Sequence, residues 1–136
     1  MYATGEGVEE DPTEAVRLFR LASAQGYAEA QFSLGCMYAN GQGVEQNYST
    51  AARLFVSARD GGYNEATDAL DSLYPLLFPV GVAVKVVGLE KHKHLNNQIG
   101  IIWPVESVRP GRLSVLLSGA EKAIAIRGEN LITHNP

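Results

Sequence analysis

The segment MYATGEGVEE at residues 1–10 returns as MYANGQGVEQ at residues 37–46. When residues 1–36 are laid over residues 37–72 without gaps, 17 of the 36 positions are identical. A fixed period of roughly 20–50 residues is typical of a solenoid built from stacked supersecondary units. The repeat therefore predicts a solenoid for the first half of the chain, and it does so before any single motif is considered.

Each unit of the repeat contains two apolar stripes with helical spacing. The first stripe predicts a helix over residues 13–26, because its members recur one period later at spacings of 3, 1 and 3. These members are Ala15, Leu18, Phe19 and Ala22. The second stripe predicts a helix over residues 27–38, and it contains Ala30, Leu34, Met37 and Tyr38. Asp11 before Pro12 is typical of a helix N-cap, and we expect Asn47 to cap the next unit.

The segment LGCMYANGQGVEQNYSTAARLFVSARDGGYNEA at residues 34–66 resembles a Sel-one-like (Sel1-like) repeat, a relative of the tetratricopeptide repeat. The matching pattern is LG-x-MY, then G-x-GV, a polar cap, A…A and a closing G-x-x-x-A. The resemblance covers residues 1–74, and it departs from the pattern at LDSLY, residues 70–74. It implies an α-solenoid that acts as a scaffold or adaptor in protein complexes.

At some positions the two repeats carry different residues, and we expect that the fold does not require a particular residue there. Between residues 28–35 and 64–71 such positions share one helix face, which a solenoid would present on its concave surface. We therefore predict a protein-binding surface at Gln31, Phe32, Thr67 and Asp68. Two interpretations of Phe32 stay open: it packs against a neighbouring helix or the second domain, or it anchors a ligand.

After Tyr74 the sequence changes from helical to strand-like patterns. PLLFP at residues 75–79 is expected to be a short linker. Residues 80–136 contain short β-branched runs separated by turn signals, which predict four or five strands and a small all-β barrel. The predicted fold class is therefore α+β: a helical-repeat (α-α solenoid) domain at residues 1–74, followed by the barrel at residues 80–136.

The segment VKVVGLEKHKHLNNQIGII at residues 84–102 resembles the start of a Src-homology-three-type (SH3-like) barrel of the KOW sort. Gly88 and Gly100 occupy the glycine positions of that pattern, and Asn97 stands where a loop glycine is common. The resemblance implies a domain that binds RNA, ribosomal partners or proteins.

Charge is distributed unevenly between the two halves. Residues 1–79 hold 4 Lys/Arg and 11 Asp/Glu, a net charge of −7, whereas residues 80–136 hold 7 Lys/Arg and 4 Asp/Glu, a net charge of +3. The second half thus offers a candidate surface for nucleic acid or a second partner, consisting of Lys85, Lys91, Lys93, Trp103, Arg109 and Arg112. Nucleic acid is the less favoured ligand, because aromatic side chains for base stacking are nearly lacking in this half.

The sequence contains no pattern typical of a catalytic or metal site. The Gly-x-Gly of each unit follows a helix rather than a strand, unlike a dinucleotide-binding loop. Cys36 has no histidine in its half of the chain to activate it, and the lysines around His92 and His94 oppose a cation. We therefore expect no enzyme, no catalytic residue, no cofactor and no bound metal.

The remaining expectations concern location and partners. No apolar run reaches the roughly 18 residues that span a bilayer, residues 1–10 lack a signal-peptide pattern, and Cys36 is the lone cysteine. These features favour a reducing, cytoplasmic location without membrane insertion. The helix over residues 13–26 lacks a preceding partner helix, so we expect either an upstream extension or self-association through this helix.

Together these patterns favour a non-enzymatic scaffold or adaptor that binds a protein or peptide. The alternative is a nucleic-acid-binding or ribonucleoprotein-binding protein that acts through its basic C-terminal barrel.

Overall fold

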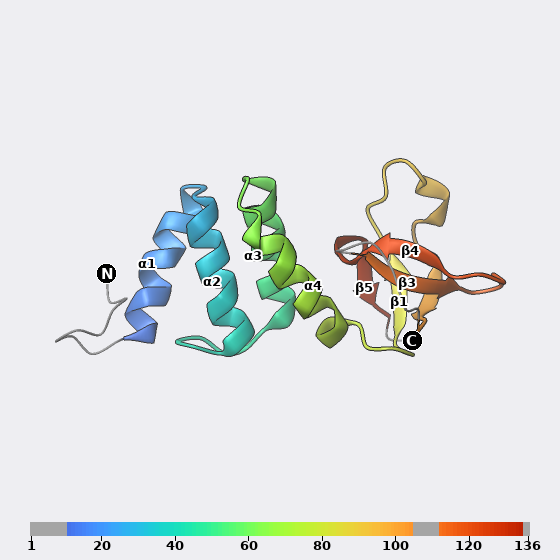
Figure 1. Ribbon diagram of the computed structural model, residues 1–136, viewed down its shortest axis with the longest axis horizontal. Helices are drawn as coiled ribbons and strands as arrows, with labels where there is room; N and C mark the ends of the chain where they lie inside the picture. The colour runs from blue at the N-terminus through green and yellow to red at the C-terminus, as the bar shows by residue number, and fades with distance from the viewer. Residues whose placement is uncertain (1–10, 105–111, 135–136) are drawn as a thin grey trace. The chain divides into compact units, whose positions relative to one another are not determined.

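The computed structural model describes residues 11–104 and 112–134, and the chain divides into two compact units, residues 1–70 and 71–136 (Figure 1). Helices make up the described part of the first unit. They are α1 (Pro12–Ala24), α2 (Ala28–Asn40), α3 (Tyr48–Asp60) and the first turns of α4 (Glu65–Leu77), each helix being 13 residues long. The sequence prediction of paired helices in each repeat is therefore confirmed.

The N-termini of α1 and α3 are capped as the sequence predicts. The Asp11 side chain accepts a hydrogen bond from the backbone N–H of Glu14 at 3.2 Å. The Asn47 side chain accepts one from the backbone N–H of Thr50 at 3.0 Å. Each cap satisfies one of the backbone donors that a helix N-terminus leaves without an intrahelical partner, which fixes where the helix begins.

The Gly-x-Gly motif of the second repeat, Gly41 and Gly43, ends α2 and turns the chain toward α3. Gly41 follows α2 with φ 67°, a left-handed conformation that favours glycine. Gly43 has φ 73°, and a Cβ atom at this position would meet the carbonyl oxygen of Pro12. Gly43 is thus required both for its backbone conformation and for the close approach of the loop to the start of α1.

Helix α2 packs against both α1 and α3, and the core of the first unit lies along these contacts. Small residues allow the helices to approach closely: Ala51 and Ala58 of α3 are fully buried. A Cβ atom at Gly35 would lie 2.7 Å from the Phe55 ring. On α1 the buried residue is Val16, whereas the predicted stripe of that helix is half-buried, namely Ala15, Leu18, Phe19 and Ala22.

Helix α4 continues through most of the segment expected to be a linker. Pro75 lies inside the helix, which ends at Leu77, and the Phe78 N–H still bonds the Tyr74 carbonyl at 2.8 Å. The boundary between the compact units falls inside this helix, between Leu70 and Asp71. A proline inside a helix removes one backbone hydrogen bond and brings its ring close to the carbonyl of the residue four positions earlier, yet α4 continues past Pro75. Residues 75–77 are therefore helical rather than an irregular linker.

The second unit contains a five-stranded antiparallel sheet with the order β4-β3-β2-β1-β5. Its strands are β1 (Ala83–Val86), β2 (Ile99–Ile102), β3 (Arg112–Leu117), β4 (Ile124–Arg127) and β5 (Leu131–Thr133). Two short 3-10 helices accompany them, η1 (Lys93–Leu95) and η2 (Gly128–Asn130). The predicted strands are confirmed.

Burial alternates along β1 and β2, as a sheet with one core face requires. Val84, Val86 and Val115 are fully buried, and they belong to the core of this unit. Asn97, in the loop between β1 and β2, has φ 69° and is the one non-glycine residue with positive φ among the described residues. Asparagine adopts this conformation more readily than most residues, which suits its place in this loop.

The C-terminal part of α4 reaches η2 within the second unit. Gly128 is buried, and a Cβ atom there would meet the ring of Tyr74. Tyr74 and Phe78 are both buried, with ring centroids 6.4 Å apart. The glycine thus allows the end of the helix and the start of β5 to pack together.

The sequence predicts a closed barrel, and the structure gives a sheet. Among the described strands β4 and β5 are the two edges of that sheet, so the prediction of a closed barrel is not confirmed. In the described residues no helix is both long and apolar enough to cross a membrane.

Candidate interaction surfaces

The residues predicted to form a binding surface on the repeats lie on two helices. Gln31 and Phe32 belong to α2, and Thr67 and Asp68 belong to the first turn of α4. Asp68 is exposed, and the other three residues are half-buried. In the described part of the chain no hydrogen bond, ion pair or ring contact joins the pair on α2 to the pair on α4. Their role in binding stays a prediction.

Phe32 takes part in an aromatic cluster of the first unit. Its ring centroid lies 4.9 Å from that of Tyr63 and 5.5 Å from that of Phe55, and both pairs of rings are tilted. Phe55 is buried on α3, whereas Phe32 and Tyr63 are half-buried. Tilted contacts at such distances are favourable aromatic geometry. Phe32 therefore packs against a neighbouring helix, and part of its side chain is also accessible to solvent.

The helix face that carries Phe32 is shaped by its contact with the neighbouring helix. A Cβ atom at Gly61 would lie 3.0 Å from the Ala28 side chain, and one at Gly35 would lie 2.7 Å from the Phe55 ring. Ala28, Phe32 and Gly35 thus face α3 and its C-terminus. The premise that differing positions are free of the fold's demands is therefore wrong for this face of α2.

The positions that are apolar on α2 and polar on α4 differ because the two helices occupy different places in the solenoid. The equivalents of Ala28, Phe32 and Gly35 one period later are polar: Asn64, Asp68 and Asp71. After α4 the chain continues into β1 rather than into another repeat helix. Terminal repeats of a solenoid need a polar outer face. Helix α4 carries such a polar face. The local sequence alone does not show which helix packs against which, so it does not distinguish a packing face from an outer face.

Burial and nearby charges change two pKa values near the aromatic cluster. Partial burial raises the pKa of the Cys36 thiol. Desolvation, followed by the carboxylate of Glu65, raises the pKa of the Tyr63 hydroxyl, which also donates a hydrogen bond to Glu65 at 3.3 Å. A reactive cysteine needs the opposite shift, toward the thiolate. The environment of Cys36 is thus that of a packed thiol.

The predicted basic surface of the second unit is dispersed over several elements. Lys85 is half-buried on β1, where it lies opposite Ile99 of β2 and Ile132 of β5. Lys93 is exposed on η1, and Trp103, 44% exposed, follows β2. Arg109 lies outside the described residues. The structure brings together only two of the predicted residues, Lys91 and Arg112, at a hollow of about 750 Å³.

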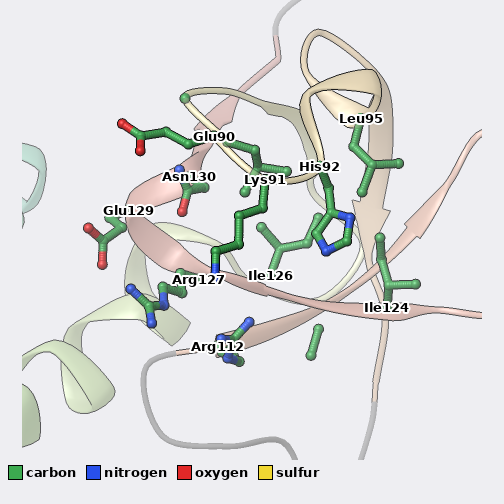
Figure 2. Close-up of a pocket in the computed structure, with 13 residues that line it drawn as sticks. Glu90, Lys91, His92, Leu95, Arg112, Ile124, Ile126, Arg127, Glu129 and Asn130 are labelled. Atoms are coloured by element: carbon green, nitrogen blue, oxygen red, sulfur yellow. The ribbon is translucent and has the colours of Figure 1, made fainter.

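This hollow lies between the loop after β1 and the edge strand β4, and we call it the β4 hollow (Figure 2). Its lining comes from the loop, from Arg112 at the start of β3, from all of β4 and from η2. The residues are Gly88, Leu89, Glu90, Lys91, His92, Leu95, Arg112, Ile124, Ala125, Ile126, Arg127, Glu129 and Asn130. Figure 2 shows Lys91 and His92 extending from the loop toward β4. The β4 hollow combines an apolar floor with several cations.

Arg127 and His92 are functional candidates that the sequence prediction leaves out. Arg127 lies directly opposite Arg112 in the register between β3 and β4. The strand pattern alone could have suggested this pairing, because the turn at Ser118-Gly119 joins the two strands. His92, in the loop after β1, is exposed. In the parts of the chain that the structure describes, no cluster of three His, Cys, Asp or Glu residues could hold a metal ion.

Comparisons with known proteins find a family match for the helical segment. Residues 1–27 and 28–63 match the family model of the Sel1 repeat. Sel1 repeats are therefore shown for this segment, as the sequence resemblance suggests. A comparison with curated proteins gave no match.

Two solved structures are similar to this chain. One is a Sel1 repeat protein from Oxalobacter formigenes, with 29% identity and a TM-score of 0.51. The other is c5321, a protective antigen present in uropathogenic Escherichia coli strains displaying an SLR fold, with 36% identity and a TM-score of 0.52. The similarity covers 55% and 56% of this chain, but only 30% and 16% of those chains. This chain therefore spans less than a third of either relative.

Proposed function

We propose that this chain is a non-enzymatic scaffold or adaptor module whose repeats hold a protein or peptide partner in the cytoplasm. The observation that carries the proposal is the match of residues 1–63 to Sel1 repeats, because proteins with such repeats generally bind other proteins. The thiol pKa of Cys36, raised by burial, agrees with this function, since it disfavours a nucleophilic cysteine.

The proposed partner surface contains Gln31, the accessible part of Phe32, Thr67 and Asp68. Helix α2 offers an aromatic side chain already held in place by Phe55 and Tyr63, so little conformational entropy is lost when a partner covers it. The exposed carboxylate of Asp68 favours a partner segment with a Lys or Arg. An apolar residue next to a basic residue is therefore the expected recognition feature.

Site-specific photo-cross-linking of the full chain tests this function. A photoreactive residue placed at Gln31 or Asp68 is expected to capture a defined protein from lysate, whereas one at Arg53, which is exposed on α3, captures none. The capture should persist after nuclease treatment. Equal capture from Arg53, or none from either test position, would contradict the proposed surface.

Nucleic-acid binding through the C-terminal unit, in the manner of an SH3-like or KOW-like domain, is the second candidate function. The cations around the β4 hollow support it, and the lack of aromatic rings other than His92 in the lining weakens it. In the same cross-linking experiment, capture that disappears with nuclease would favour this candidate over the scaffold.

A further inference from the structure

The β4 hollow borders a strand whose outer edge is unpaired in the described part of the chain. Strand β4 is the first strand in the sheet order and pairs with β3 alone. Outside that ladder, its backbone makes no hydrogen bond within the described residues. An exposed edge of this kind is a template for another strand, because alternate residues direct both N–H and C=O groups outward. The hollow gives such a strand room beside β4.

Two cations lie directly opposite each other at the mouth of this hollow. Arg112 of β3 and Arg127 of β4 are register partners, and neither has an ion-pair partner within residues 11–104 and 112–134. Like charges at such positions are destabilising unless an anion lies between them. Lys91 lines the same hollow and extends toward β4 (Figure 2). The arrangement suits a carboxylate or phosphate oxygen.

The remaining lining favours a peptide over a nucleic acid. Ile124, 37% exposed, and the buried Ile126 lie on the face of β4 opposite to that of Arg127. Apart from His92, no ring on which a base could stack lines the hollow. An added strand of alternating side chains would place its acidic residues beside Arg127 and its apolar residues beside the isoleucines.

We propose that the β4 hollow binds an extended acidic segment of a partner protein, which adds a strand to the free edge of β4. Its backbone pairs with β4, one of its carboxylates binds between Arg112 and Arg127, and its apolar side chains cover Ile124. The site lies within the second unit and does not depend on the repeat surface proposed above. An experiment can therefore contradict one of the two proposals and leave the other intact.

A model peptide tests this proposal on the full chain. The probe is an acetylated, amidated octapeptide of alternating Glu and Val, titrated into 15N-labelled protein. We expect saturable shifts of the amide signals of residues 124–127 and slower exchange of their outward amide protons. Arg127→Gln should weaken binding about tenfold or more, because a charge-assisted pair is lost. Lys122→Gln, which removes an exposed cation outside the hollow, should change the affinity by less than about twofold.

Several results would overturn the proposal. They are the absence of shifts at β4, equal weakening by Arg127→Gln and Lys122→Gln, and equal affinity for the peptide with Gln in place of Glu. A peptide with central prolines, which cannot pair with β4, should not bind, and its binding would exclude strand addition. Tighter binding of octauridylate at the same amides would assign the site to nucleic acid. If Arg127→Gln does not keep the amide spectrum of the fold, Arg112→Gln provides the same test.

Discussion

The Phe32 ring contributes to the fold and also reaches solvent, so its removal should affect stability. Truncating a buried phenylalanine typically costs about 3–5 kcal/mol, and a half-buried ring in contact with two others should cost about 1–3 kcal/mol. We expect Phe32→Ala to lower the midpoint of urea unfolding, and Phe55→Ala, at a buried position, to lower it further. An unchanged midpoint for Phe32→Ala would show that the aromatic contacts add nothing to the fold.

Cys36 offers a test of burial through its acidity. Burial raises its thiol pKa, so alkylation by iodoacetamide should reach its half-maximal rate at a higher pH in the folded chain than in urea. For an acid with a raised folded pKa, the stability contribution is complete below the unfolded pKa and is lost as pH rises through the folded pKa. Cys36→Ala should therefore lose less stability than the wild type as pH rises above the ordinary pKa of a thiol. Identical alkylation profiles in both states would contradict the burial of this thiol.

Gly43 should be less tolerant of a side chain than glycines with similar backbone conformations. Gly43 and Gly62 both have positive φ, but a Cβ atom meets Pro12 at the first position and nothing within 4 Å at the second. We expect Gly62→Ala to cost about 1–2 kcal/mol, which is the backbone cost alone. Gly43→Ala should cost clearly more in chemical unfolding. Equal losses would mean that the loop can move away from α1 without penalty.

At the level of elements, the sequence predicts the helices and strands because their signals are local. Asp11 and Asn47 mark where α1 and α3 begin, and alternating β-branched residues mark β1 and β4. Pro75 is the exception, since proline usually ends a helix, yet α4 continues to Leu77. Tyr74 and Phe78, on either side of Pro75, are both buried, and this burial favours a helix that continues past the proline. That burial depends on packing, which local patterns do not contain.

The contact between Tyr74 of α4 and Gly128 of η2 should be detectable as coupling between two mutations. Gly128→Ala places a methyl group against a buried ring, and overpacking of this kind typically costs about 1–3 kcal/mol. Tyr74→Leu removes the ring and should restore part of the loss. In a double-mutant cycle from thermal unfolding we expect the double variant to be less destabilised than the sum of the single variants. Additive losses would exclude a direct contact.

For the whole molecule, the candidate sites are harder to predict than the fold, because they depend on which segments meet. The charges of Lys91, Arg112 and Arg127 are visible in the sequence, but their meeting at one hollow follows from the register between β3 and β4 and from the path of the 88–95 loop. Likewise, the polar residues of α4 suggest a binding face when viewed in the sequence. In the structure they are the expected surface of the last helix of a solenoid.

Self-association through α1 is a prediction for the intact chain. Leu18 and Phe19 are half-buried and Leu21 is 54% exposed, so this helix presents apolar surface. Sedimentation equilibrium should show an average mass that rises with concentration, and Leu21→Glu should lower it at each concentration. Leu76→Glu is the matched control, because Leu76 is 59% exposed outside α1 and should leave the mass unchanged. A monomeric wild type at high concentration would contradict the prediction.

The polar face of α4 has a consequence for engineering repeat number. An additional 36-residue unit joined after α4 would have to pack on Asp68 and Asp71, and it would move these carboxylates out of water at a cost in free energy. A copy of residues 28–63 inserted directly after Tyr63 would instead contain its own α2-like and α3-like helices. The copied Ala28, Phe32 and Gly35 would then pack against the copied α3-like helix. The solenoid can thus be lengthened from within, while its last helix keeps the same polar end.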